Sequence, residues 1–65
     1  MVKFERYSPF LIFIHYDNKC IGCIEKYFKR RLYTVIFYGN REIKSCTTRT
    51  LLKAKEIVYD VLGVQ

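Results

Sequence analysis

Four side chains of the kinds that bind zinc occur along the chain: His15, Cys20, Cys23 and Cys46. Thiolates and imidazoles are the ligands of structural zinc sites, and Cys20 and Cys23 have the C-x-x-C spacing that such sites use. The strand expected over residues 21–27 would nevertheless send Cys23 to the opposite face from His15 and Cys46, and a second C-x-x-C pair is missing. We therefore interpret Cys23 as a small core residue and expect no metal or other cofactor.

Residues for acid–base or nucleophilic catalysis are not grouped in the sequence. His15 is the one histidine and lies within an apolar run, and the carboxylates are dispersed. No glycine-rich phosphate loop is present, and Ser8 and Ser45 lack a motif that would activate them. A redox C-x-x-C normally opens a helix, whereas residues 20–23 follow a turn into a strand. These patterns predict a binding protein and not an enzyme.

Basic and aromatic residues are the other chemically distinctive group. Twelve Lys and Arg against six Asp and Glu give a formal net charge of +6. This charge favours polyanionic or acidic partners, although solubility alone could also account for it. Rings that stack on bases, beside cations that neutralise phosphates, suit a sequence-tolerant single-strand binder. The candidate nucleic-acid-binding residues are Phe13, Lys26, Lys29, Arg30, Arg31, Tyr33, Phe37, Lys44 and Arg49.

The strands that would carry these residues are predicted from runs rich in β-branched and aromatic side chains. Four runs have this character: residues 10–16, 21–27, 32–38 and 41–46. Asn18-Lys19 and Gly39-Asn40 are the expected two-residue turns, and residues 28–31 form the remaining loop. Residues 2–7 alternate apolar and charged side chains, so they could add an edge strand before Pro9.

One helix is predicted at the C-terminus. Its apolar residues recur at helical spacing: Leu51, Ala54, Val58 and Val61. Thr47, Thr48 and Thr50 offer N-cap oxygens, and Gly63 can end the last turn. Arg49 near the start of the helix is unfavourable for the helix dipole, which favours a phosphate or acidic partner there. A solvated side chain is the alternative interpretation.

The expected turns set one register, which divides the strand residues between two faces. The first face is mostly apolar and is the expected seat of the helix: Phe10, Ile12, Ile14, Tyr16, Ile21, Cys23, Tyr27, Leu32, Ile36, Tyr38 and Ile43. The second mixes aromatic residues with cations: Leu11, Phe13, His15, Gly22, Ile24, Lys26, Tyr33, Val35, Phe37, Glu42 and Lys44. Because one helix covers only one face, the second face is expected to bind nucleic acid, another protein or a second copy.

The predicted fold class is α+β, in one domain over residues 1–65. It consists of a small antiparallel sheet of about four strands, an optional N-terminal edge strand, and one C-terminal helix packed on one face. In its order of hairpin, threonine-containing turn and helix, the stretch 32–62 resembles plant-type AP2 domains and the arm-binding domains of tyrosine recombinases. The resemblance implies that the sheet reads the DNA major groove. The chain has no Trp, so it departs from the Trp and Gly pattern of those families.

Two functions follow from these patterns. The preferred one is a small basic regulatory or accessory protein that binds nucleic acid through an aromatic and basic sheet face. The alternative is a protein-interaction or inhibitor module, such as a homodimer, that uses the same face or an edge strand. The sequence has no apolar run of roughly 18 residues, no signal peptide and an odd number of cysteines, so we expect a cytoplasmic protein without a membrane partner. The composition would also suit a viral or mobile-element accessory protein.

Overall fold

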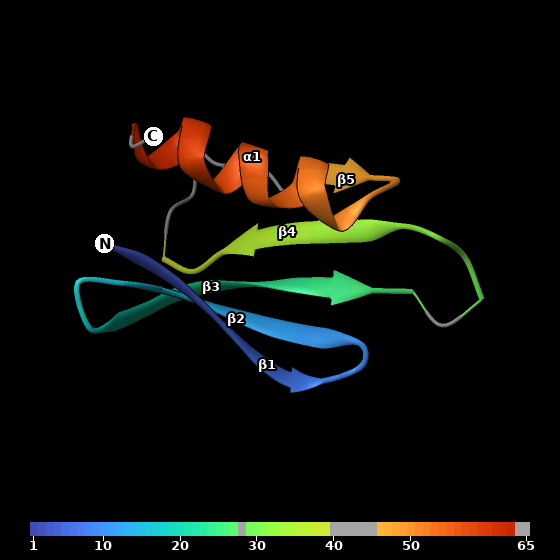
Figure 1. The fold of residues 1–65 in the computed structure, drawn as a ribbon, viewed down its shortest axis with the longest axis horizontal. Helices are drawn as coiled ribbons and strands as arrows, with labels where there is room; N and C mark the ends of the chain where they lie inside the picture. The colour runs from blue at the N-terminus through green and yellow to red at the C-terminus, as the bar shows by residue number, and fades with distance from the viewer. Residues whose placement is uncertain (28, 40–45, 64–65) are drawn as a thin grey trace.

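A computed structural model describes residues 1–27, 29–39 and 46–63 of the chain. Its strands are β1 (Val2–Ser8), β2 (Leu11–Tyr16), β3 (Lys19–Lys26), β4 (Tyr33–Phe37) and β5 (Cys46–Thr48), and they are followed by the helix α1 (Leu51–Leu62). The strands form one antiparallel sheet in the order β1-β2-β3-β4-β5, and α1 lies against one face of it (Figure 1). The predicted α+β architecture is confirmed, and the optional edge strand is present as β1.

The ends of α1 are determined by the residues that flank it. Thr50 has an extended backbone, and its Oγ1 accepts a hydrogen bond from the Lys53 N–H at 3.1 Å. Gly63 adopts a left-handed conformation with φ of 70° and donates its N–H to the Asp60 carbonyl. Thr50 and Gly63 therefore act as predicted. Thr47 and Thr48 do not cap the helix, because they belong to β5.

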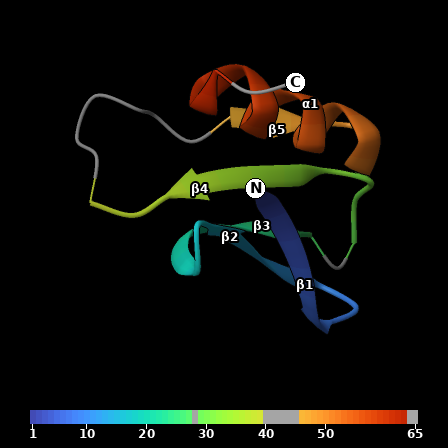
Figure 2. The same cartoon turned by 60° about the vertical axis from the view of Figure 1, so that its left-hand side comes forward.

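The core lies between α1 and the sheet face that it covers, which we call the helix face. Its buried cluster consists of Ile12, Ile14, Ile24, Val35, Ala54 and Val58. The helix also reaches the first strand, since the Phe4 and Tyr59 rings meet edge to face at 6.0 Å between centroids. Contacts of α1 with β4 and β5 at the other edge mean that the twisted sheet wraps around the helix (Figure 2). Among the described residues, no helix is long and apolar enough to cross a membrane.

The hairpin between β2 and β3 differs from the prediction in two ways. Its turn residues are Asp17 and Asn18, both with positive φ, so that Tyr16 pairs with Lys19. A β-bulge then shifts the register between Ile14 and His15. The displaced turn alone would leave every side chain on its expected face, because it changes the pairing by an even number of residues. The bulge changes the pairing by one residue and therefore exchanges the two faces of the sheet beyond it.

The exchange of faces overturns part of the predicted division. The structure pairs Ile12 with Ile24, and Ile24 with Val35, on the helix face. Residues assigned to the second face that in fact pack against the core cluster or belong to it are Ile24, Tyr33, Val35 and Phe37. Some residues assigned to the core face lie elsewhere. Cys23 and Ile36 are on the opposite face, and Tyr27 and Tyr38 are exposed. The predicted 28–31 loop is consistent with the pairing of Lys26 with Tyr33. Ile43, Glu42 and Lys44 lie outside the described residues.

Gly22 is required by the close approach of β3 to β4 next to the bulge. A Cβ atom at this position would overlap the backbone carbonyl of Ile36. Because backbone atoms on both sides are held by the sheet, neither strand can move away without disturbing the ladder.

We expect Gly22→Ala to lower the free energy of unfolding by about 1 to 3 kcal/mol, the usual cost of overpacking. Urea denaturation followed by circular dichroism would measure the loss. Lys19→Ala in the same strand is the control, because Lys19 is exposed. Equal stability of the Gly22→Ala variant and the wild type would contradict the strand approach described here.

Candidate nucleic-acid interface

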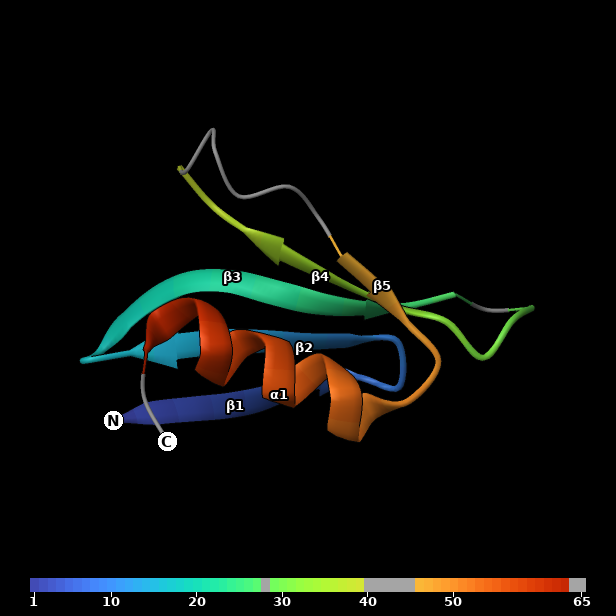
Figure 3. The same ribbon diagram turned by 90° about the horizontal axis from the view of Figure 1, so that it is seen from above.

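Three chain connections meet at one end of the molecule. The β1–β2 turn, the β3–β4 loop and the β5–α1 connection all lie on the right in Figure 1, and they stay together in the view from above in Figure 3. The N-terminus and the C-terminal end of α1 lie at the opposite end (Figure 1). An antiparallel meander produces this arrangement, because alternate connections fall on the same side of the sheet.

The residues gathered at this end are strongly basic. We call the set the basic end and define it by Arg6, Lys26, Lys29, Arg30, Arg31 and Arg49. All but the half-buried Lys26 are exposed. Glu5 and Glu25 directly precede Arg6 and Lys26 along the chain, but they point to the other face because successive strand residues alternate. Several unit positive charges therefore share one small region of surface.

A shallow hollow of about 110 Å³ lies within the basic end. Its cationic lining comes from Arg6 of β1 and Lys26 of β3, and its aromatic lining from Phe10 and Tyr33. The Lys26 Nζ atom lies 5.8 Å from the centroid of the Tyr33 ring, within cation–π range. Two cations beside aromatic rings can accept a phosphate while a ring stacks on a neighbouring base.

The first turn of α1 adds to the same positive potential. It contains no acidic residue, and Arg49 comes directly before the Thr50 N-cap. The helix dipole places partial positive charge at this terminus, so Arg49 is unfavourable for the isolated helix. Lys53 is partly neutralised by Glu56, since the Lys53 Nζ and Glu56 Oε2 atoms are 3.2 Å apart.

The structure separates the predicted binding residues into two groups. It brings together those at the basic end: Lys26, Lys29, Arg30, Arg31, Tyr33 and Arg49. Phe37 pairs with Gly22 toward the other end and packs against the core cluster. Phe13 is on the sheet face opposite α1, where its ring meets Tyr7 edge to face at 5.7 Å. Lys44 lies outside the described residues.

Arg6 and Phe10 are the members of the hollow that sequence reasoning missed. Val2 and Phe4 begin an alternation that would require an apolar side chain at position 6, on the helix face. Arg6 occupies that position and pairs with Ile12 of the core cluster. A cation at the end of an apolar row is the signal that could have identified it.

The sheet face opposite α1, which we call the open face, is not basic. Its side chains are Lys3, Glu5, Tyr7, Leu11, Phe13, His15, Cys23, Glu25, Thr34, Ile36 and Tyr38. One lysine is set against two glutamates, and His15 Nε2 lies 3.5 Å from Glu5 Oε1. The sequence predicted that the face opposite the helix would carry cations among its aromatic residues. Aromatic residues are present on this face, but its carboxylates outnumber its lysine, so the prediction of a cationic face is wrong.

The open face has its own packed centre. Cys23 is only 3% exposed although it points away from α1. A side-chain hydrogen bond with Cys23 is the main cause that raises the pKa of Tyr38 to about 12, with burial and the Cys23, Cys20 and Glu25 charges acting in the same direction. Thr34 and Thr47 hydroxyls lie 3.3 Å apart beside this centre.

The four side chains considered as zinc ligands do not converge. His15 and Cys20 are cross-strand partners, but Cys46 is in β5, two strands away from β3. Within the described ranges, no three His, Cys, Asp or Glu side chains are grouped to hold a metal ion. Sequence reasoning placed Cys23 on the wrong face, because Cys23 pairs with Phe13 on the open face.

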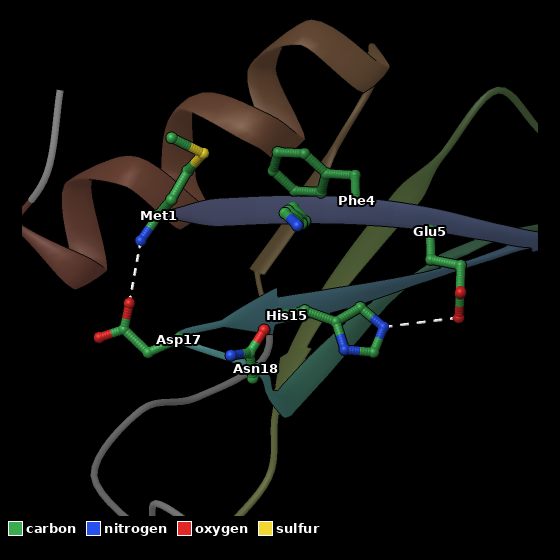
Figure 4. A pocket seen from close by; sticks show the side chains of 7 residues that line it. Met1, Phe4, Glu5, His15, Asp17 and Asn18 are labelled. Atoms are coloured by element: carbon green, nitrogen blue, oxygen red, sulfur yellow. Dashed lines mark hydrogen bonds and ion pairs between the residues drawn. The ribbon is translucent and has the colours of Figure 1, made fainter.

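His15 and Glu5 line a wide hollow near the N-terminus, together with Asp17, which pairs with the Met1 amino group at 3.0 Å (Figure 4). A histidine beside a carboxylate resembles part of an acid–base site. The nearby Cys20 thiol, however, donates to the Gly22 carbonyl at 3.7 Å. The geometry therefore does not pair this thiol with an imidazole base.

Comparison of the chain with protein-family models, curated proteins and solved structures found no match. The resemblance of residues 32–62 to AP2 and arm-binding domains depends on a predicted strand over residues 41–46, most of which lie outside the described residues.

Proposed function

We propose that this protein binds nucleic acid through the basic end, by electrostatic capture of successive backbone phosphates. The observation that carries the proposal is the convergence of cations from the β3–β4 loop, the β5–α1 connection and the adjoining ends of β1 and β3 on one end of the sheet. These segments lie on the right of Figure 1. The two ends of the molecule differ in charge, because Asp17 and Asp60 offset Lys3 and Lys19 at the other end, whereas six cations gather at the basic end. This polarity would orient the protein as it approaches a polyanion.

The rings beside the cations supply the second part of the mechanism. Phe10 is 41% exposed and Tyr27 is 55% exposed, and both lie where the strands enter the basic end. Stacking of an unpaired base on such a ring contributes roughly 1 to 3 kcal/mol. Bases in a duplex are already stacked on each other, so these rings favour a single strand or an unpaired loop.

The proposed site differs from the one that the sequence predicted. Tyr33 remains beside Lys26 at the basic end, but Phe37 packs against the core and is not available for stacking on an open sheet face. The open face, with its two glutamates, would repel phosphates. Nucleic acid would therefore bind across the end of the sheet, and not on its face.

We expect single-strand binding to depend steeply on salt. With up to six phosphate contacts, the counterion-release relation predicts a loss of roughly 10²- to 10³-fold in affinity between about 50 and about 200 mM salt. Fluorescence anisotropy with a labelled mixed-sequence strand of about 10 nucleotides would measure this slope. Absence of binding at the lowest salt, or binding with no salt dependence, would overturn the proposal.

A further inference from the structure

The open face leaves an aromatic surface without a cover from any described helix or strand. Tyr7 is 73% exposed and Tyr38 is 49% exposed, at opposite ends of the face. Between them, Phe13 and Ile36 flank the buried Cys23. The Tyr7–Phe13 ring contact already orders two of these side chains. Ordered rings lose little conformational entropy when a partner covers them.

The charges of the chain indicate whether a second copy or a polyanion is the better partner for this surface. The whole chain carries a formal charge of +6, so two copies repel each other in most orientations. The open face is the exception, because its Lys3 is outweighed by Glu5 and Glu25. The open face therefore repels a second positively charged copy least. Its lysine can also pair with a glutamate of the other copy across a two-fold axis. A polyanion, in contrast, would be repelled by the open face and attracted to the basic end.

The size of the face is adequate for a small interface. Five strands about 4.8 Å apart and roughly six residues long, at about 3.3 Å per residue, give a projected area of roughly 500 Å². Because the aromatic side chains project from the sheet, the accessible area of the face is larger than its projected area. Specific interfaces begin at about 600 Å² per partner, so a dimer that used the whole face would fall at the lower end of that range.

We propose that the protein forms a homodimer in which the open faces of two copies pack together around a two-fold axis. Tyr7, Phe13 and Tyr38 are the aromatic anchors of each copy. The arrangement is a sandwich of two sheets with α1 on each outer side, a packing common for twisted antiparallel sheets. Both basic ends stay uncovered, so the dimer presents two phosphate-binding surfaces. Dimerisation does not depend on the proposed nucleic-acid binding.

The stability of the single copy supports the same conclusion. A chain of 65 residues buries only about 60% of its unfolded surface, so its core contributes little stability. Covering a second apolar face adds burial without lengthening the chain. A dimer of this kind would therefore be more stable at higher protein concentration.

Light scattering coupled to size-exclusion chromatography, over a range of protein concentrations, tests the dimer directly. We expect twice the mass of the 7.9 kDa chain at high concentration, and a dimer that persists in high salt. Tyr7→Glu with Tyr38→Glu should raise the dissociation constant by about 30-fold or more, because four carboxylates would then face each other in the interface. Both tyrosines are exposed in the single copy, so the fold should tolerate the change, and circular dichroism would verify it.

Phe10→Glu is the matched control, because Phe10 is also an exposed aromatic residue but lines the hollow of the basic end on the helix face. We expect it to leave the dimer intact and to weaken binding of the single strand. A wild-type chain that stays monomeric at all concentrations would overturn the dimer. So would a dimer that Phe10→Glu dissociates and the open-face variant does not. Neither result would affect the test of nucleic-acid binding, which uses salt dependence on a strand too short to need two copies.

Discussion

Lys29→Glu combined with Arg30→Glu is expected to weaken single-strand binding by roughly 10- to 100-fold at low salt. Each reversal removes one phosphate contact and adds a repelling charge, so the salt slope should fall by about two. Both residues lie in the β3–β4 loop and are exposed, so the fold should not change. Anisotropy titrations of the wild type and the variant at several salt concentrations would measure both effects.

The control for this experiment reverses two lysines at the other end of the molecule. Lys3→Glu with Lys19→Glu changes the net charge by the same amount, but these residues lie beside the Asp17–Asn18 turn. We expect at most a few-fold loss for this variant. An equal loss in both double variants would mean that net charge alone drives binding, which would contradict a localised basic end.

Ile24→Ala is expected to lower the free energy of unfolding by about 2 to 5 kcal/mol, because the truncation leaves a cavity in the core. Ile24 is 1% exposed and lies between Ile12 and Val35. A domain of this size has only about 3 to 10 kcal/mol of stability in total, so much of the variant would be unfolded. Chemical denaturation at low protein concentration, where a dimer would dissociate, measures the change.

Ile36→Ala is the matched comparison, since it removes the same atoms from the open face. The register expected from the sequence places Ile36 in the core and Ile24 outside it, whereas the structure places them the other way round. We expect Ile36→Ala to cost less than half as much as Ile24→Ala. A larger loss for Ile36→Ala would refute the register that the bulge produces.

The resemblance between the predicted and observed folds depends on local patterns. Alternation, turn residues and the helical spacing of apolar residues act over a few positions, so β1 to β4 and α1 could be predicted directly. The fourth strand was expected at residues 41–46, whereas β5 is Cys46–Thr48 and residues 41–45 lie outside the described residues. Thr50 and Gly63 set the ends of α1 through hydrogen bonds within their own turns, and these were also predictable. The clustering of Lys29 to Arg31 at one end was visible from the chain for the same reason.

The division of side chains between the two faces could not be predicted in the same way. One extra residue at the Ile14–His15 bulge sends Ile24 into the core and Cys23 out of it. A bulge has a small local cost, and its position is chosen by which arrangement buries more apolar surface under α1. That comparison involves β2, β3, β4 and the helix together. Sequence alone therefore determined the elements and the net charge, whereas tertiary packing decided which face is open and that the cations meet beside Arg6 at one end.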